Sequence, residues 1–493
     1  MSAKHVKRIK RKNPLFGIIL SLIQLLITIF FLTFIVQLSV LPLKYTMTIA
    51  VVLLLIWLLV FLSQIKWKGH GLGKFVSILM TFVLSVGSFY IYKTNSTILN
   101  VVENGNVTIT GMVVVVLKDD PAKTIMDAAD YKFGIQKSLS SLDTEKAMKE
   151  INTKIGGTIE TKEYSGFDDQ VKALYSGEVD AIIYNSAFDG TIKESFADYE
   201  SKVRVLESIA LTEKTVTEPV GKTNSKIVQE PFNLFISGID VFGSISQTSR
   251  SDVNIIATIN PETKQILLTT TPRDYYVKLP GVSGTKFDKL THAGIYGIKT
   301  SKDTLAAIYD IEIENYVRVN FTSFIDIIDA LGGVSVYSAQ KFSAFGQDYV
   351  KGYNQMDGQK ALTFARERHS FVDGDFQRGR NQLEVIKAII KKLSSSALLT
   401  NYAGFMDTLS GGIQTDLSSS EIRSLVKMQT SDNATWNIQT ISALGTPAMR
   451  YCYSYSGSKL SVDLPDEDSV ELIKDYMQQV MDGEIIKVET KTN

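Results

Sequence analysis

An unusual density of charge marks residues 365–382, which read ARERHSFVDGDFQRGRNQ and contain four arginines and three acidic residues. Guanidinium groups bind phosphate oxygens through two parallel hydrogen bonds, and neighbouring carboxylates can hold them in place. Two interpretations are open: a solvated surface of ion pairs, or the wall of a site for a highly anionic ligand. For a charge run taken alone, the surface interpretation is favoured.

Helical spacing divides this segment. Residues three and four positions apart share one face of a helix, so Asp375, Arg378 and Gln382 should form one stripe. Arg380 follows Arg378 by two positions, which is a rotation of about 200°. The spacing therefore predicts that Arg378 faces the site and that Arg380 points elsewhere.

A second charged group surrounds a predicted β-hairpin. Arg250 and Asp252 open the hairpin, Arg273 and Asp274 close it, and Asp240 ends the preceding strand. All five should emerge at one edge of a sheet, where open α/β sheets bind ligands. Two carboxylates suit a hard divalent cation, and several arginines suit a pyrophosphate. This combination indicates phosphoryl transfer, in which catalysis is mainly positioning and electrostatic stabilisation.

The elements that must position these residues form an α/β pattern from residue 231 onward. FNLFISGID reads as a buried strand, and VNIIATI and QILLTTT flank the turn sequence NPETK. Three helices are predicted, with Ser301, Thr322 and Asp357 as N-caps, and DFQRGRNQLEVIKAIIKKLSS predicts a longer one.

A second α/β pattern precedes this domain. VTITGMVVVVL predicts a strand, SLDTEKAMKEINTKIGG predicts a helix with Ser141 as N-cap, and DDQVKALYSGEVDAIIYN predicts a helix followed by a strand. The segment 107–212 loosely resembles one lobe of an extracellular solute-binding protein. Without a second lobe to close over a ligand, it is expected to be an accessory interaction domain. Residues 212–230 read as a linker.

The N-terminal part predicts a membrane anchor. A basic segment, MSAKHVKRIKRKN, precedes three apolar runs at about 16–38, 45–62 and 75–92. Each run is close to the ~20 residues that a membrane-spanning helix needs. Lysines concentrate in the N-terminal segment and the second connection, so the positive-inside rule predicts a cytoplasmic N-terminus and extracytoplasmic C-terminal domains.

Several function classes are not favoured. The formal net charge is zero, so nucleic acid is not an expected partner. The single cysteine, Cys452, cannot form an intramolecular disulfide and is expected to be a buried apolar side chain. The four histidines are too scattered for a zinc site, and neither a G-x-S-x-G elbow nor a P-loop occurs.

Seven short motifs in order carry a family resemblance: FISGID, RSD, TTPRD, KLTHAGIYG, DALGGV, MDGQKALTFARER and GDFQRGRNQ. They resemble the LytR-CpsA-Psr (LCP) family over roughly 231–395, and the three spans with an accessory lobe resemble its capsule-type CpsA members. The expected fold class is α/β, with a central mixed sheet flanked by helices in the LCP domain. The expected domains are the tail and three transmembrane helices (1–95), the accessory domain and linker (96–225), the LCP catalytic domain (226–485) and a C-terminal tail (486–493).

The resemblance implies a membrane-bound transferase. Such a protein moves a capsular polysaccharide, or a related anionic glycopolymer, from a polyprenyl-pyrophosphate carrier to cell-wall peptidoglycan, with Mg²⁺ or Mn²⁺ as cofactor. The implied partners are this lipid-linked polymer, peptidoglycan, the membrane and other capsule-synthesis proteins. By match to the family's motifs, the implied metal ligands are Asp240 and Asp252, the catalytic residues are Arg273, Arg378 and Asp375, and the substrate-binding residues are Arg250, Arg273, Arg366, Arg368, Arg378, Gln382 and Lys289.

Some roles and alternatives stay open. Asp375 should orient the arginines and Asp274 should be structural, although either could serve as a base, and Lys289 could equally be a surface lysine. Many family members carry Arg-Gln where this chain has Asn381-Gln382, so one phosphate contact is absent or replaced. Two other functions compete with transfer: a membrane-anchored regulator of capsule synthesis or transcription, and a polyprenyl-pyrophosphate pyrophosphatase.

Overall fold

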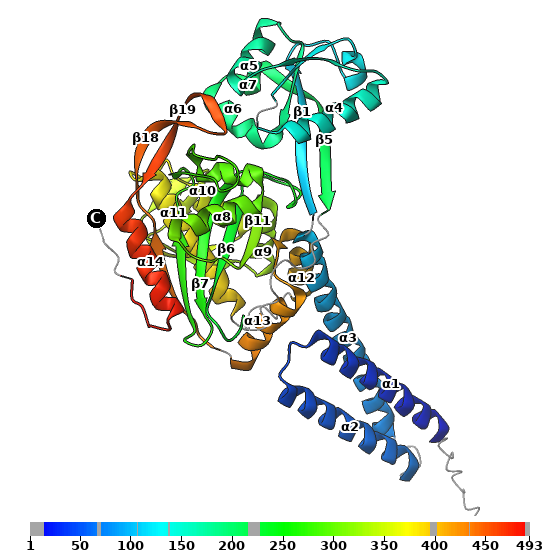
Figure 1. Ribbon diagram of the computed structural model, residues 1–493. Helices are drawn as coiled ribbons and strands as arrows, with labels where there is room; N and C mark the ends of the chain where they lie inside the picture. Colours follow the sequence, from blue (N-terminus) through cyan, green and yellow to red (C-terminus); the bar gives the residue numbers. More distant parts are fainter. Residues whose placement is uncertain are drawn as a thin grey trace, which may run out of the picture. The chain divides into compact units, whose positions relative to one another are not determined.

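The structure is a computed structural model that describes residues 14–66, 71–105, 107–136, 139–214, 227–394, 402–432 and 434–488. The chain divides into two compact units (Figure 1). The first contains the described residues up to Leu99 together with 419–432, and the second contains the others. The basic segment 1–13, the second connection at 67–70 and most of the predicted linker, 215–226, lie outside the described residues.

The first unit is built on three apolar helices, α1 (Pro14–Leu38), α2 (Leu43–Lys66) and α3 (Gly71–Gly105). All three are long and apolar enough to cross a membrane, which confirms the predicted apolar helices. Polar side chains are buried between them. The Trp57 indole donates to the Ser21 carbonyl at 3.0 Å, and the Ser77 hydroxyl donates to the Leu20 carbonyl at 2.9 Å. Helix α13 (Ser419–Asp432) belongs to the same unit.

The accessory domain occupies the start of the second unit. Its sheet has the order β3-β2-β4-β1-β5, in which β1 runs antiparallel to both neighbours and β2 runs parallel to both. The bounds are β1 (Val107–Leu117), η1 (Ile125–Ala128), β2 (Lys132–Ile135), α4 (Ser141–Ile155), β3 (Glu160–Glu163), α5 (Phe167–Ser176), β4 (Ala181–Asn185), η2 (Ser186–Phe188), α6 (Asp189–Ser195), α7 (Tyr199–Lys202) and β5 (Val203–Lys214).

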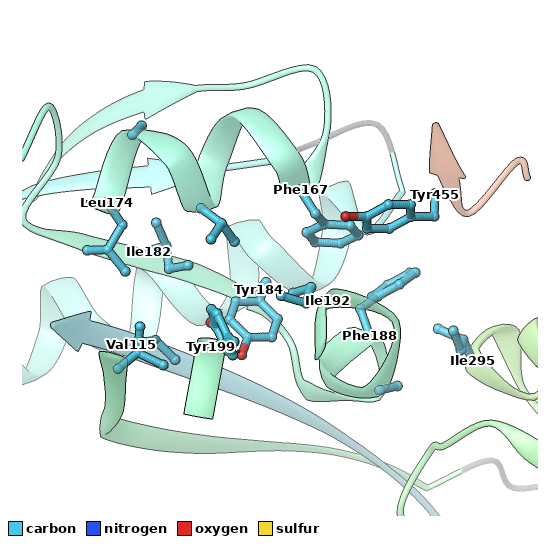
Figure 2. Packing of buried hydrophobic residues seen from close by; sticks show 14 of the residues in the cluster. Val115, Phe167, Leu174, Ile182, Tyr184, Phe188, Ile192, Tyr199, Ile295 and Tyr455 are labelled. Carbon is cyan, nitrogen blue, oxygen red and sulfur yellow. Dashed lines mark hydrogen bonds between the residues drawn. The ribbon is translucent and has the colours of Figure 1, made fainter. Parts of the chain in front are cut away.

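Helices pack on both faces of this sheet. Successive side chains of β1 point to opposite faces, so the strand contributes to both layers. Val114 packs with the residues of α4, and Val115 packs with those of α5. The α5 side includes a residue of a distant segment: the ring of Tyr455 stacks on Phe167 with centroids 6.4 Å apart (Figure 2). The predicted strand at 107–117 and the predicted helix from residue 141 are confirmed, with Ser140 as the N-cap in place of Ser141.

The second α/β domain, from residue 227 onward, contains a mixed sheet of order β16-β11-β6-β7-β8-β17. β7 is antiparallel to both of its neighbours, β6 and β8, whereas β11 pairs parallel with β6 and β17 pairs parallel with β8. The predicted hairpin is therefore present. The bounds are β6 (Phe232–Ile239), β7 (Ser251–Asn260), β8 (Gln265–Thr270), β11 (Asn315–Asn320), β16 (Gln414–Thr415) and β17 (Asn437–Ser442).

Helices cover both faces of this sheet, as the near-continuous apolar strands require. Ile256 and Leu267 pack toward one set of helices, while Ile255 and Leu268 pack toward Leu383 on the opposite face. The helices are η3 (Leu290–Tyr296), α8 (Ile298–Tyr309), α9 (Phe321–Ala330), α10 (Gly358–Arg366), α11 (Gly374–Leu393), α12 (Tyr402–Gly412) and α14 (Glu467–Met481). Short strands complete the domain: β9 (Tyr276–Val277), β10 (Asp288–Lys289), β12 (Val334–Ser338), β13 (Phe342–Ala344), β14 (Gln347–Tyr349), β15 (Gly352–Met356), β18 (Gly445–Cys452) and β19 (Tyr455–Pro465).

The helix starts differ in part from the predicted caps. Asp357 caps α10 by accepting from the Lys360 backbone N–H at 2.8 Å, as predicted. The cap of α9 is Asn320, so the choice of Thr322 was wrong, and Ser301 lies inside α8. A cap must sit in extended backbone just before the first turn, and Asn320 does so because it directly ends β11.

Candidate active site

A cavity of about 470 Å³ opens at the edge of the sheet where β6 ends and β7 begins. Part of its lining is apolar and includes Ile236, Val253, Phe324, Val385 and Ile386. The lining also contains charged and polar residues predicted from sequence: Asp240, Arg250, Asp252, Arg273, Arg366, Arg368, Arg378 and Gln382. The cavity is therefore amphipathic, with an apolar part and a strongly cationic part.

The two predicted metal-binding acids lie on adjacent strands, because Ile239 of β6 pairs with Ser251 of β7. Asp252 accepts from Arg273 Nη1 at 3.0 Å and from the Thr291 hydroxyl at 2.7 Å. Burial alone would raise the pKa of Asp252, but the charges of Arg273 and Arg250 outweigh it and hold the pKa at about 2. Asp252 is therefore a carboxylate at any physiological pH.

Asp240 behaves differently. Burial and the neighbouring charge of Asp252 raise its pKa, and Arg366 only partly opposes them, with an N–O distance of 3.9 Å. A raised pKa means that the second negative charge is poorly compensated by the protein itself. A bound cation would supply that compensation.

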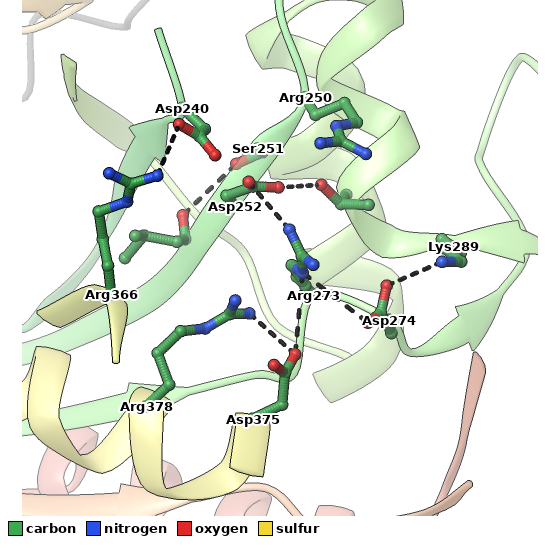
Figure 3. A network of polar contacts seen from close by, with 12 residues as sticks. Asp240, Arg250, Ser251, Asp252, Arg273, Asp274, Lys289, Arg366, Asp375 and Arg378 are labelled. Carbon is green, nitrogen blue, oxygen red and sulfur yellow. Dashed lines mark hydrogen bonds and ion pairs between the residues drawn. The ribbon is translucent and has the colours of Figure 1, made fainter. Parts of the chain in front are cut away.

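Asp375 is shared by three arginines from separate segments, and Figure 3 shows two of them, Arg273 and Arg378. Its carboxylate lies 2.8 Å from Arg378 Nη2, 3.5 Å from Arg368 Nη1 and 3.7 Å from Arg273 Nε. Without the Asp375 carboxylate, the positive charges of the three guanidinium groups would lie close together with less compensating negative charge. Arg378 already shows that cost, since burial and the charge of Arg273 lower its pKa.

Arg366, Gln382 and Arg380 occupy distinct places. The Arg366 guanidinium lies 4.4 Å from the centre of the Phe321 ring, which also lines the cavity. Gln382 donates to the Ala365 carbonyl at 3.3 Å and so ties α11 to α10. Arg380 contacts Asp373 and Gln377 and is absent from the cavity wall, as the helical spacing predicts.

Lys289 is not a surface lysine. Its side chain is 5% exposed, and its ammonium lies between Asp274 at 3.2 Å and Glu194 at 3.3 Å. It does not line the cavity, so the structure does not bring it together with the other predicted phosphate contacts. Asp274 also lies 3.7 Å from Arg273 Nε. Its contacts with two cationic side chains fit the structural role predicted for it.

Sequence reasoning did not select two residues that shape the site. Thr291, which holds Asp252, lies inside the quoted motif KLTHAG, so the motif itself was the available signal. Glu194, which contacts Arg250, comes from α6 of the accessory domain. Glu194 is one of three acids in TIKESFADYE and has no sequence signal of its own, because only tertiary docking brings it to this site.

The donor set fits a divalent cation of the Mg²⁺ type. Such ions take one or two protein carboxylates and complete their shell with phosphate oxygens and water. Asp240 and Asp252 provide two carboxylates that both line the cavity. Among the described residues no group of three or more His, Cys, Asp or Glu could form an all-protein metal cage.

Comparison with known proteins agrees with this geometry. Residues 198–466 match the LytR_cpsA_psr family. The chain is 35% identical over 200 residues to a polyisoprenyl-teichoic acid–peptidoglycan teichoic acid transferase TagU of Enterococcus faecalis, a match that covers 40% of this chain and 65% of that protein. It is 30% identical over 235 residues to the Bacillus cereus protein of the same name, covering 47% and 76%.

A similar solved structure is the crystal structure of TagV from B. subtilis. It is 25% identical, covers 52% of this chain and 98% of that one, and aligns with a TM-score of 0.44. The chain thus spans somewhat less than two thirds of the Enterococcus relative. The matched segment includes every sequence-predicted site residue.

Proposed function

The chain belongs to the LytR_cpsA_psr family, and we propose that it transfers an anionic glycopolymer from a polyprenyl-pyrophosphate carrier to cell-wall peptidoglycan. One observation carries this proposal. The lining of the cavity combines apolar side chains with a cluster of arginines, which suits a ligand with an apolar tail and a highly anionic head. A polyprenyl pyrophosphate has this composition.

In this proposal the apolar part of the lining holds the first part of the polyprenyl tail. Its residues come from the strands and from α9 and α11, and they include Ile236, Phe324 and Val385. A water-soluble nucleotide or sugar phosphate would leave them in contact with water, which is unfavourable at about 25 cal/mol for each Å² exposed.

The head group is proposed to lie against the arginines. Arg250, Arg273, Arg366, Arg368 and Arg378 bind its oxygens, and Gln382 adds a neutral donor. Asp375 positions the arginines, since its carboxylate faces three guanidinium groups. Lys289 is proposed to act at a distance, through Asp274, because it is outside the cavity wall.

The reaction is a phosphoryl transfer. A hydroxyl of peptidoglycan attacks the phosphorus that bears the glycopolymer, and the bond from this phosphorus to the bridging oxygen breaks. The hydroxyl proton passes to the departing phosphate, and polyprenyl phosphate leaves. Arg273 and Arg378 stabilise the charge that develops on the phosphate oxygens, since both are largely buried and held in place before the substrate binds. Asp240 and Asp252 would hold Mg²⁺ or Mn²⁺, which supplies further neutralisation of the pyrophosphate when bound.

The polymer is proposed to be a capsular polysaccharide. What supports this choice is the resemblance noted from the sequence, in which three apolar runs followed by an accessory lobe are similar to capsule-type family members. The named relatives are teichoic acid transferases, so a teichoic acid donor is the natural comparison. Other capsule-synthesis proteins are the expected protein partners.

The test uses the full chain in detergent with lipid-linked polymer and purified peptidoglycan. We expect radiolabelled polymer to become insoluble with the peptidoglycan, with release of an equal amount of polyprenyl phosphate, and both should require divalent cation. Capsular and teichoic acid donors are compared side by side, and a faster reaction with the teichoic acid donor would reverse the choice of polymer.

Two results would contradict the proposal. Release of polyprenyl phosphate at the same rate without peptidoglycan would identify a pyrophosphatase. Full activity in the presence of excess chelator would remove the role assigned to Asp240 and Asp252. The regulator hypothesis draws on the basic segment 1–13, which lies outside the described residues.

A further inference from the structure

The accessory domain contributes one wall of the cavity. Gly190, Lys193 and Glu194 of α6 line it together with residues of the catalytic domain. Helix α6 ends at Ser195, whereas the match to the family begins at residue 198. The family resemblance therefore does not account for this wall, and its role has to be inferred from its contacts.

Glu194 binds two cationic side chains at once. Its Oε1 atom lies 2.9 Å from Arg250 Nη1, and its Oε2 atom lies 3.3 Å from Lys289 Nζ. Among the described residues, no other carboxylate lies within ion-pair distance of Arg250. The side chain of Arg250 is only 16% exposed, so this contact fixes where its guanidinium lies.

Gly190 lies one turn before Glu194 on the same face of α6. A Cβ atom at this position would lie 2.6 Å from Arg250 Nη2 and 2.7 Å from its Cζ. The guanidinium is therefore packed against the backbone of α6 and held by Glu194. A side chain at position 190 would push it away.

Other contacts fix α6 on the catalytic domain. The Thr191 hydroxyl lies 3.4 Å from Nε2 of the buried His292, and the Ser195 hydroxyl lies 3.2 Å from that of Ser458. Nearby, the hydroxyl of Tyr455 donates to Asp168 of α5. The position of Glu194 thus follows from several polar contacts between the domains.

The contacts of Glu194 continue into the centre of the site. Lys289 joins Glu194 to Asp274, and Asp274 lies beside Arg273. Arg273 in turn contacts Asp252 and Asp375. A chain of alternating charges therefore runs from the accessory domain to the arginines that face the cavity.

We propose that Glu194 is a positioning residue for the donor, contributed by the accessory domain, and that it acts by holding Arg250 and Lys289. This inference rests on the proposed function, because it assigns the anion that Arg250 binds to the donor's pyrophosphate. Arg250 lines the cavity while it is paired with Glu194, so the contact orients the arginine at the site and does not withdraw it. The accessory domain is then part of the donor site.

The experiment measures binding of unglycosylated polyprenyl pyrophosphate to the full chain in detergent by titration calorimetry. Glu194→Gln removes the charge and keeps the size of the side chain. We expect Kd to rise about tenfold, which corresponds to loss of one partly buried charged contact. In the transfer assay, KM for the donor should rise in parallel while kcat changes less than about twofold. Glu178→Gln is the matched control, since Glu178 lies in the same domain, pairs with Lys162 and does not line the cavity.

Two further variants make the test specific. Gly190→Ala should also raise Kd, because the added side chain displaces Arg250 without removing any charge. This variant provides the test if Glu194→Gln fails to fold. In an Arg250→Ala background, Glu194→Gln should weaken binding by clearly less than it does alone. Unchanged or tighter binding by Glu194→Gln, or fully additive effects with Arg250→Ala, would overturn the inference. If the unsubstituted chain does not bind the lipid, both this inference and the proposed function fail, whereas normal binding with an unaffected variant removes only the inference.

Discussion

Asp375 and the arginines around it decide what can be expected of single substitutions. Arg378 and Arg380 lie two positions apart on α11, yet only Arg378 lines the cavity. Arg378→Ala should lower the rate of transfer about 10- to 100-fold, because it removes a buried charged contact to the donor. Arg380→Ala should stay within about twofold, since Arg380 forms a half-exposed pair with Asp373. Initial rates with both variants test this, and equal losses would contradict the assigned orientations.

Asp463 should make stability depend on pH. It is 8% exposed, and burial together with the charges of Asp274 and Asp375 raises its pKa to about 6. Because the folded pKa is above the ordinary value of 3.8, its contribution to stability is complete below pH 3.8 and is lost as pH rises through about 6.

The corresponding substitution is Asp463→Asn. It should stabilise the protein at pH 7.5, by about 2 kcal/mol, because a buried carboxylate no longer has to ionise. At pH 4 it should give no gain. Thermal unfolding of both proteins at the two pH values measures the difference, and an equal shift at pH 4 and pH 7.5 would show that Asp463 does not titrate as described.

At the level of single residues, the sequence was informative where the relative positions of side chains follow from their spacing within one helix or hairpin. Helical spacing separates Arg378 from Arg380, and the hairpin pattern brings Asp252 and Arg273 to one sheet edge; the structure shows both arrangements. It could not identify Glu194, because this residue reaches Arg250 only through the docking of another domain. Nor could it show that Lys289 is buried between two acids.

Among the elements, α10 depends on a close approach to α9. A Cβ atom at Gly358 would lie 2.7 Å from the Cα atom of Ile325, which is backbone and cannot move aside. Gly358→Ala should therefore shift α10, which carries Arg366, and should cost about 1–3 kcal/mol through overpacking. The rate of transfer should fall by more than the loss of folded protein accounts for, because Arg366 is displaced.

Gly411→Ala is the control for this substitution. Gly411 lies in α12, and a Cβ atom there would meet no atom within 4 Å. Because alanine is the better helix former, this variant should be as stable as the unsubstituted chain or slightly more stable. The unfolding midpoints and transfer rates of the two variants test the difference, and equal behaviour would remove the packing argument for α10.

The strands and long helices were predictable because their apolar periodicity is strong, whereas helix starts were less so. Asp357 was found from its position before an apolar pattern. Asn320 was missed because it ends β11 and caps α9 at once, and a strand that runs directly into a helix leaves no polar turn to mark the boundary.

For the whole molecule, the distribution of lysines predicts a cytoplasmic N-terminus. Thiol labelling can test this, because Cys452 is buried and burial raises its pKa to about 12, so it should not react. With an impermeant maleimide on intact cells, Ser39→Cys and Val372→Cys should be labelled, whereas Ser2→Cys should react only after permeabilisation. Labelling of Ser2→Cys in intact cells would reverse the topology.

The three apolar helices of the first unit bury polar side chains as well as apolar ones. Ser21, Gln24, Gln64 and Ser77 are all buried within their unit, although hydrophobic side chains alone would keep these helices in lipid. Hydrophobicity favours the placement of a helix in lipid but does not determine which of its faces contacts the neighbouring helices. Buried polar side chains determine that face, because they form hydrogen bonds between helices. The three helices thus form a packed unit, and an unrelated set of three apolar helices would not reproduce its packing.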